Sequence, residues 1–558
     1  MYAKPQLASL LRLSARNNGA QAICRRCPYG SPRLFSTSRI RRQESSDNNP
    51  TVESATAAPA PLKAADGIPI TVRELLLTKN DIQDKAAVKG WIQTIRKQKG
   101  VCFATVTDGS TAQTVQVVMT PEQGGPLTIG AAAKITGSWQ ESPVKKGQQK
   151  ELVATDVKLL AESDPGTYPL QKKSHTFEYL RTIPHLRLRS STSRSILQLR
   201  STALSQISNY FATNSFTQVQ PPILTSSDCE GAGEVFAVTA SDRKPFFTDP
   251  VYLTVSSQLH LEAMALAMSK VWCMSPTFRA EKSDTARHLN EFYMLEAEMA
   301  FVENGVEEVM AVVEGVVKSI VQGLVNNEVL KKDLLVRRND DVGLLEPEQL
   351  EKRWDGIINM PWRRVTYTQA IEALKIAVKR GEEFKAGVLA RDPKYKGTIE
   401  IPWDQGAEFK FPVEWGMNLQ SEHEKYLASL VGNGAPVFVT DYPKHLKPFY
   451  MLPNVNDKDE EGRETVACFD LLLPQVGEIV GGSMREHRYE MLEGEMKRRG
   501  MSEESIKQLG WYLELRKWGC APLGGFGIGF DRLLAYLAGV ENIRETVAFP
   551  RWFDRCLC

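Results

Sequence analysis

The stretch from Thr277 to Glu298 constrains the fold more than any other part of the chain. Thr277 to Arg279 are typical of a strand end, Lys282 to Arg287 form a polar loop, and Phe292 to Met299 alternate in polarity. Two strand-like segments on either side of a polar loop predict an antiparallel β-hairpin. Charged side chains along one face of this hairpin would suit a polyanion bound with a metal. A solvated hairpin would carry the same pattern.

Composition limits the classes of protein that this chain can belong to. Its 558 residues predict roughly two to four domains, and no apolar run approaches the roughly 20 residues that span a membrane, so we expect no membrane segment. Nine Lys and Arg and no acidic residue lie within residues 1–43, and the remainder carries an excess of seven acidic residues. Any contact with nucleic acid must therefore use local basic patches.

The N-terminal composition predicts a targeting segment. Residues 1–43 are rich in Arg and Ser and carry Leu7, Leu10 and Leu11 at helical spacing, which is typical of a mitochondrial transit peptide. A disordered basic tail is the alternative. Residues 44–68 are rich in Ser, Ala and Pro and predict a disordered linker. We therefore expect the mature protein in the mitochondrial matrix.

The rest of the chain divides into a strand-rich part and a larger mixed part. Residues 69–161 hold an early helix and short strands separated by turn residues, which predicts a small β-barrel. Residues 162–188 contain three prolines and predict a hinge connector. Residues 189–558 begin with an amphipathic helix at Thr192–Thr213. Within them, residues 380–412 hold Gly, Pro and Lys and are expected to form an irregular insertion.

A second predicted hairpin carries two acidic residues. The strands Phe469–Leu473 and Glu478–Val480 lie on either side of Pro474. In a hairpin centred there, Asp470 and Glu478 would lie opposite each other, and opposed like charges destabilise a sheet. A divalent cation would relieve the repulsion, since carboxylates together with substrate phosphates commonly hold Mg²⁺. The pattern favours a Mg²⁺ site over a solvated pair at a sheet edge.

A glycine-rich run near the C-terminus is a further candidate for ligand binding. Four glycines within residues 524–529 precede Arg532 and an apolar helix at Leu533–Leu537. The glycines allow close approach to the backbone, and an arginine at a helix start suits a terminal phosphate. The run lacks the lysine of a P-loop and no early βαβ unit precedes it, so by itself it is a weak indication.

Together these stretches resemble a class II aminoacyl-tRNA synthetase of the aspartyl/asparaginyl subgroup, over roughly residues 70–558. Phe216–Pro222 resembles motif 1 of the family, Phe278–Phe292 resembles motif 2, and Gly527–Arg532 resembles motif 3. The resemblance implies an α+β fold, in which an antiparallel catalytic sheet flanked by helices follows an N-terminal OB-fold β-barrel that reads the anticodon. It also implies a homodimer that forms through motif 1.

The resemblance assigns roles to individual residues. Arg279, Arg532 and Glu478 would be catalytic, with the two arginines on the α- and γ-phosphates of ATP. The other expected contacts are Glu281, His288, Phe292 and Glu478 for ATP; Glu230, Gln258, Leu261, Glu296 and Arg485 for the amino acid; Asp470 and Glu478 for Mg²⁺; and Arg96, Phe103 and Gln116 for the anticodon.

The expected reaction follows from the charges of its reactants. An ionised amino-acid carboxylate needs no general base to attack the α-phosphate, so catalysis consists of positioning and charge stabilisation. The products are an aminoacyl adenylate and pyrophosphate, after which the 3′ end of a tRNA accepts the acyl group. A catalytically silent RNA-binding protein is disfavoured because Arg279, Glu478 and Arg532 are present.

The resemblance favours asparagine as the substrate. Aspartate-specific relatives carry a lysine at the position of Leu261, and a buried carboxylate without a cation is costly. Trp415–Glu424 and Gly477–Arg488 also resemble the asparaginyl pattern. We expect a ligase that uses L-asparagine, ATP and tRNA(Asn) in mitochondrial translation; an aspartate–tRNA ligase is the alternative.

Overall fold

The computed structural model describes most of the chain after residue 69. The described ranges are 70–78, 81–143, 149–226, 235–242, 246–336, 343–391, 400–454 and 462–558, all within one compact unit, Ala64–Cys558. The expected transit peptide and linker, residues 1–43 and 44–68, lie outside these ranges, as does the candidate Glu230.

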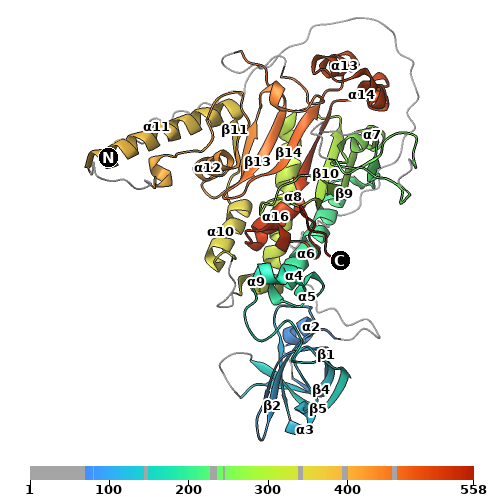
Figure 1. Ribbon diagram of the computed structural model, residues 1–558, viewed down its shortest axis with the longest axis vertical. Helices are drawn as coiled ribbons and strands as arrows, with labels where there is room; N and C mark the ends of the chain where they lie inside the picture. Colours follow the sequence, from blue (N-terminus) through green and yellow to red (C-terminus); the bar gives the residue numbers. More distant parts are fainter. Residues whose placement is uncertain are drawn as a thin grey trace, which may run out of the picture. The chain divides into compact units, whose positions relative to one another are not determined.

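The N-terminal part is a closed five-stranded barrel in the order β1-β2-β3-β5-β4 (Figure 1). Its elements are α2 (Val72–Leu77), β1 (Ile82–Lys97), β2 (Cys102–Thr107), β3 (Val115–Met119), α3 (Pro121–Gly124), β4 (Ala132–Glu141) and β5 (Lys150–Ala161). Buried residues alternate with partly exposed ones along β2 and β3, so that Val106, Val115 and Val117 fill the interior. The predicted barrel with an early helix is confirmed.

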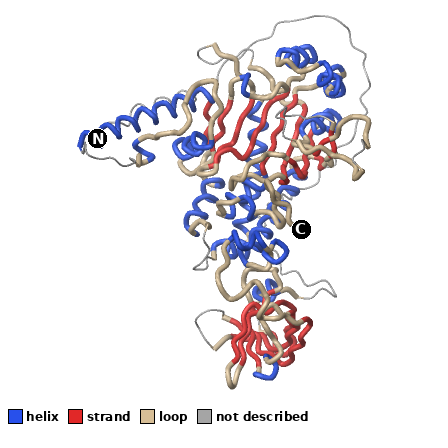
Figure 2. The backbone as a smooth tube through the Cα atoms, viewed as in Figure 1, coloured by secondary structure: helices blue, strands red, loops and turns tan. Residues whose placement is uncertain are grey.

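The larger part is built on an eight-stranded sheet in the order β11-β12-β13-β14-β15-β10-β9-β6, drawn in red in the upper half of Figure 2. Its strands are β6 (Thr217–Gln218), β9 (Lys270–Phe278), β10 (Glu291–Ala300), β11 (Arg363–Thr366), β12 (Val437–Thr440), β13 (Cys468–Leu473), β14 (Gly477–Arg485) and β15 (Leu523–Gly529). Within this sheet, only β11–β12 and β6–β9 pair in parallel. The predicted antiparallel hairpin is β9–β10, and the α+β fold is confirmed.

One face of the sheet carries the main hydrophobic core. Five helices cover it: α6 (Ser191–Thr213), α8 (Val306–Asn326), α9 (Glu328–Leu335), α10 (Pro347–Ile358) and α16 (Phe530–Ala538). Along α8, Val309, Val313, Val316 and Ile320 recur at helical spacing and are fully buried. Each such side chain stabilises the fold by about 1.5–3 kcal/mol relative to an exposed one, so this stripe anchors α8 to the sheet.

The other face carries smaller cores and a polar cavity. Six helices belong to this side: α7 (Gln258–Met268), α11 (Tyr367–Arg391), α12 (Ser421–Gly432), α13 (Tyr489–Arg498), α14 (Glu503–Gln508) and α15 (Gly510–Glu514). The remaining elements are α4 (Phe177–Thr182), α5 (Pro184–Arg187), β7 (Leu224–Thr225), β8 (Tyr252–Leu253) and the short 3₁₀ helices at Trp403–Gln405, Lys444–Leu446, Leu515–Lys517 and Ile543–Glu545. No described helix is both long enough and apolar enough to cross a membrane.

The expectation of an irregular insertion at residues 380–412 is wrong in its first part, because α11 continues without a break to Arg391. Gly381, one of the glycines of this segment, lies where the helix meets another segment. A Cβ atom at this glycine would lie 2.4 Å from the carbonyl oxygen of Ala407. The glycine therefore permits close packing inside the helix and does not end it.

Candidate active site

A cavity of about 340 Å³ opens on the polar face of the sheet and collects the predicted site residues. All candidates for the ATP, amino-acid and metal sites except Glu230 line it: Gln258, Leu261, Arg279, Glu281, His288, Phe292, Glu296, Asp470, Glu478, Arg485 and Arg532. They come from separate segments that the sheet brings together, which is why no short sequence window contains the site.

Strand alternation positions the residues of β10. Phe292, Met294, Glu296 and Glu298 line the cavity, whereas Leu295 belongs to the core beneath the sheet. The neighbouring glycine-rich run is the central strand β15, and a Cβ atom at Gly525 would lie 1.9 Å from Oε2 of Glu298. The glycines thus leave room for side chains of the adjacent strands, a role that the sequence did not reveal.

One end of the cavity is cationic and carries an aromatic ring. Arg279 follows β9, with its guanidinium 5.9 Å from the ring centre of Phe292, and Arg532 lies in the first turn of α16. Nε2 of His288 lies 3.2 Å from Oε2 of Glu281, and Nη1 of Arg279 lies 3.8 Å from Oε1 of Glu281. Burial lowers the pKa of His288, although Glu281 opposes the shift. This arrangement suits a flat base and a phosphate chain.

Two carboxylates meet beside this cationic end, but not as predicted. Asp470 pairs with Gly481 and Glu478 pairs with Leu472, so the expected direct opposition of the two acids is wrong. The register is displaced because Gln475 turns the chain with a φ of 69° and the ladder is irregular after Leu471.

The missing side chain of Gly481 brings the two carboxylates together nonetheless. A Cβ atom there would lie 3.6 Å from Oε1 of Glu478 and 3.7 Å from Oδ1 of Asp470. Burial and the charge of Asp470 raise the pKa of Glu478 to about 7. Converging, partly desolvated carboxylates of this kind fit a Mg²⁺ ion, although no cluster of three or more metal-ligating side chains occurs among the described residues.

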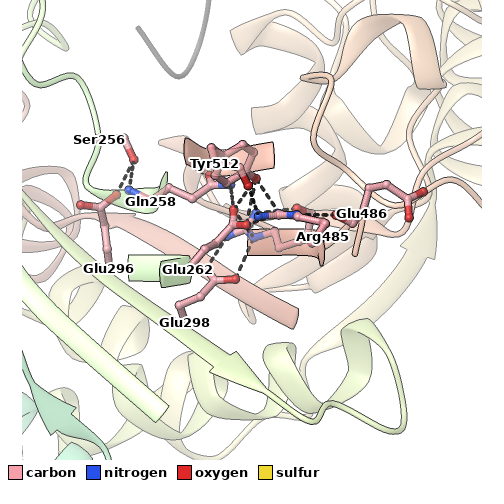
Figure 3. Close-up of polar contacts among 10 residues, drawn as sticks. Ser256, Gln258, Glu262, Glu296, Glu298, Arg485, Glu486 and Tyr512 are labelled. Carbon is pink, nitrogen blue, oxygen red and sulfur yellow. Dashed lines mark hydrogen bonds and ion pairs between the residues drawn. The ribbon is translucent and has the colours of Figure 1, made fainter. Parts of the chain in front are cut away.

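The opposite end of the cavity is a network of fully paired charges (Figure 3). Arg485 holds Glu298 with two hydrogen bonds, from Nε to Oε1 at 3.0 Å and from Nη2 to Oε2 at 2.9 Å, and donates through Nη1 to Ser483. Behind it, Glu262 accepts hydrogen bonds from Tyr512 and Arg516. Burial raises the pKa of Glu298, whereas Arg485 lowers it.

Glu296 and Gln258 complete this end. The backbone N–H of Ser257 lies 3.0 Å from Oε2 of Glu296, and the Ser256 hydroxyl also donates to this carboxylate. Gln258 donates to Glu262 over 3.1 Å. Leu261 from the same helix is buried and lines the cavity without a charge.

Several lining residues received no role from the sequence. Glu298 lies two residues after Glu296 on β10, so the two side chains lie on the same face of the strand. Strand alternation alone could therefore have placed Glu298 in the cavity. Lys447 also lines the cavity, whereas Tyr512 and Arg516 contact Glu262 outside its lining; all three belong to loops and short helices far along the chain. No local pattern predicts their contacts, because these depend on tertiary packing.

The three anticodon candidates lie on the outer side of the barrel. Arg96 on β1 pairs with Phe103 on β2, and Gln116 on β3 pairs with Thr105. Nε2 of Gln116 donates to Oε2 of Glu151 over 3.1 Å. A half-exposed aromatic ring beside an exposed arginine suits stacking on an unpaired base.

Comparison with known proteins places this architecture in a family. Residues 177–553 match the model for class II tRNA synthetases (D, K and N), and residues 86–160 match the OB-fold nucleic acid binding domain. The chain therefore belongs to the class II tRNA synthetase family, as the motifs predicted.

Individual relatives give a more specific comparison than the family model does. The chain is 42% identical over 493 residues to the mitochondrial asparagine–tRNA ligase of Saccharomyces cerevisiae, covering 84% of this chain and 92% of the relative. The mitochondrial asparagine–tRNA ligase of Schizosaccharomyces pombe is 41% identical over 479 residues, covering 83% and 93%. The asparaginyl-tRNA synthetase of Pyrococcus horikoshii, complexed with asparaginyl-adenylate, has a TM-score of 0.69 at 26% identity, covering 88% and 99%.

Proposed function

We propose that the protein is an asparagine–tRNA ligase that activates L-asparagine with ATP and transfers it to the 3′ end of tRNA(Asn). The observation that carries the choice of asparagine is that Arg485 is already paired within the protein. Its guanidinium already pairs with Glu298 and Ser483, and Leu261 adds no cation. An aspartate side chain would meet no uncompensated positive charge, so its carboxylate would be buried at a free-energy cost. The neutral amide of asparagine avoids this cost.

In the first step, a carboxylate oxygen of asparagine attacks the α-phosphorus, and the bond to pyrophosphate breaks. Arg279 orients the α-phosphate, Phe292 stacks on adenine beside Glu281 and His288, and Arg532 binds the γ-phosphate. Glu296, with Gln258 and Glu230, binds the ammonium group. Their contribution is to hold two anions in line and stabilise the charge that develops.

Asp470 and Glu478 are the residues that would hold Mg²⁺ in this cavity. The ion supplies charge neutralisation for the phosphates when it is bound. Their convergence over Gly481 and the raised pKa of Glu478 support this assignment, because both indicate two acidic groups held close together in a partly buried site.

In the second step, the 3′ hydroxyl of the terminal tRNA ribose attacks the acyl carbon and releases AMP. The barrel would select the tRNA through Arg96, Phe103 and Gln116, by stacking and polar contacts to the anticodon. We further propose a homodimer that forms through Phe216–Pro222.

We propose that residues 1–43 direct the protein to the mitochondrial matrix and are followed by a linker at 44–68. The mitochondrial relatives support this location. The predicted divisions at 69–161, 162–188 and 189–558 are retained as the proposed anticodon-binding domain, hinge and catalytic domain.

Pyrophosphate exchange into ATP tests the assignment, with asparagine and aspartate supplied separately. We expect exchange with asparagine at least about 100-fold faster than with aspartate, and charging of a tRNA(Asn) transcript. Exchange driven by aspartate alone would support the aspartate–tRNA ligase instead. Absence of exchange with any amino acid, from folded protein, would contradict the proposal.

A further inference from the structure

A lysine that no sequence motif marked lies directly on one of the two converging carboxylates. Nζ of Lys447 donates to Oδ1 of Asp470 at 2.9 Å and to Oδ2 at 2.7 Å. Both side chains line the cavity, and Lys447 is the only lysine to do so among the described residues. A single cation therefore spans both oxygens of the carboxylate that the proposed metal site requires.

Lys447 is held in place by Tyr442 and by the backbone of its own loop. Its Nζ lies 3.9 Å from the ring centre of Tyr442, a buried residue at the start of the same loop. The backbone around it is also fixed, since Leu446 N–H donates to Pro443 and Lys444 N–H donates to Glu464. The side chain of Lys447 is only 17% exposed. The lysine is thus a built feature of the cavity floor, and not a surface chain that meets Asp470 by chance.

The neighbouring carboxylate, that of Glu478, has different hydrogen-bond partners. Glu478 lies on the same side of Gly481, yet no described residue donates a hydrogen bond to its side chain. Nη1 of Arg532 is directed at the Glu478 carbonyl oxygen, 3.4 Å away. Of the two proposed metal ligands, Asp470 has a cation hydrogen-bonded to its carboxylate and Glu478 does not, within the described residues.

We propose that Lys447 is a positioning residue that competes with the divalent cation for Asp470, so that the cation binds tightly only together with ATP. The inference rests on the proposed function, because it takes Asp470 and Glu478 as the metal ligands. Two cations next to one carboxylate repel each other strongly in a partly buried cavity. The phosphates of ATP bring the negative charge that allows Lys447 and the cation to share the cavity.

Binding of Mn²⁺ to the nucleotide-free protein, followed by its electron paramagnetic resonance signal, measures this competition without any turnover. We expect Lys447→Met to bind Mn²⁺ at least about 10-fold more tightly than the unsubstituted protein, since two carboxylates then face the cavity without a counter-charge. Lys444→Met is the matched control. It removes a lysine from the same loop, where Nζ lies 3.3 Å from Glu495, and should leave Mn²⁺ affinity unchanged. Equal or weaker binding by folded Lys447→Met would overturn the proposal.

A second measurement does not depend on how the Lys447 variant folds. If Lys447 withholds Asp470, the double variant Lys447→Met/Asp470→Asn, which removes both charges of the pair, changes the Mn²⁺ affinity of the nucleotide-free protein less than twofold, while Glu478→Gln weakens it. A large loss in the folded double variant would show that the cation already uses Asp470 and would contradict the competition. Asparagine-dependent exchange by the unsubstituted protein separates the two claims, because it tests the proposed function and is independent of either Mn²⁺ result.

Discussion

The two ends of the cavity hold similar charges in opposite ways. At the end proposed to bind the amino acid (the amino-acid end), the carboxylates of Glu298 and Glu262 each accept a hydrogen bond from a guanidinium, that of Arg485 or Arg516. At the end proposed to bind the phosphates (the phosphate end), no described residue donates a hydrogen bond to the Glu478 carboxylate, and Lys447 is the one cation hydrogen-bonded to Asp470 among the described residues. The first end is complete in the protein alone, whereas the second has carboxylates and cations placed to meet a ligand.

This difference indicates how one cavity can combine selectivity with catalysis. A buried, fully paired network resists rearrangement, so it fixes the shape and charge that a side chain must match. An incompletely paired cluster gains most when a charged ligand arrives, which is where electrostatic stabilisation of a reaction is strongest. We therefore assign amino-acid selection to the first end and adenylate formation to the second.

Breaking the phosphate end should give the largest loss of activity. Arg532→Ala removes a cation from the first turn of α16, and we expect asparagine-dependent exchange to fall about 1,000-fold, because the γ-phosphate loses its charged partner. Binding of tRNA, measured by filter retention, should change less than twofold. Unchanged exchange would show that Arg532 does not contact the nucleotide.

Breaking the amino-acid end should cost stability as well as activity. Arg485→Met leaves Glu298 buried without its partner, and we expect the free energy of unfolding to fall by about 3–5 kcal/mol in urea titration. Lys497→Met is the control, since Lys497 also pairs with a carboxylate, that of Glu493, but the two side chains are 61% and 31% exposed. Equal losses in the two variants would contradict the contrast between buried and exposed pairs.

Changing the charge of the amino-acid end should change its selectivity. Leu261 is buried and lines the cavity, so Leu261→Lys places a cation where a substrate side chain would lie. We expect the ratio of kcat/KM for asparagine over aspartate in pyrophosphate exchange to fall about 100-fold. Leu266→Lys, on the same helix but outside the cavity lining, should leave the ratio unchanged.

The unpaired carboxylate should make stability depend on pH. Burial and Asp470 raise the pKa of Glu478 from 4.5 to about 7, so the folded state binds this proton more tightly than the unfolded state does. The associated stability is present below pH 4.5 and is lost as the pH rises to about 7. Glu478→Gln cannot ionise, and we expect it to be about 1–3 kcal/mol more stable than the unsubstituted protein at pH 8 and equal to it below pH 5. A variant that is less stable at pH 8 would contradict this sign.

The smallest effect should come from the barrel. Gln116→Ala removes one candidate contact to the anticodon, and we expect kcat/KM for charging of tRNA(Asn) to fall about 10-fold with exchange unchanged. Val118→Ala, two residues further along β3, serves as the control on the same outer side. A fall in exchange would indicate that the substitution acts through folding and not through tRNA.

What the sequence predicted correctly depends on local periodicity. The alternation in Phe292–Met299 predicted β10, and the apolar helix after the glycines predicted α16, because each pattern repeats within one element. The family motifs then supplied the residues of the cavity, whose geometry no single element encodes.

What the sequence did not predict depends on register and packing. The opposition of Asp470 and Glu478 failed because a turn residue and an irregular ladder displaced the pairing. Lys447 could not be found because its contact with Asp470 joins a loop to a strand 23 residues away. The helix α11 was not predicted beyond residue 380, because the contact that Gly381 permits joins it to Ala407, which is distant in sequence.

Affinity for two stable adenylate analogues tests the division of the cavity most directly. Asparaginyl and aspartyl sulfamoyl adenosine share the nucleotide part and differ only in the group that meets Arg485 and Leu261. By isothermal titration calorimetry, we predict a Kd at least about 100-fold lower for the asparaginyl analogue, because the paired end offers no free cation. Equal affinities, or tighter binding of the aspartyl analogue, would contradict the account.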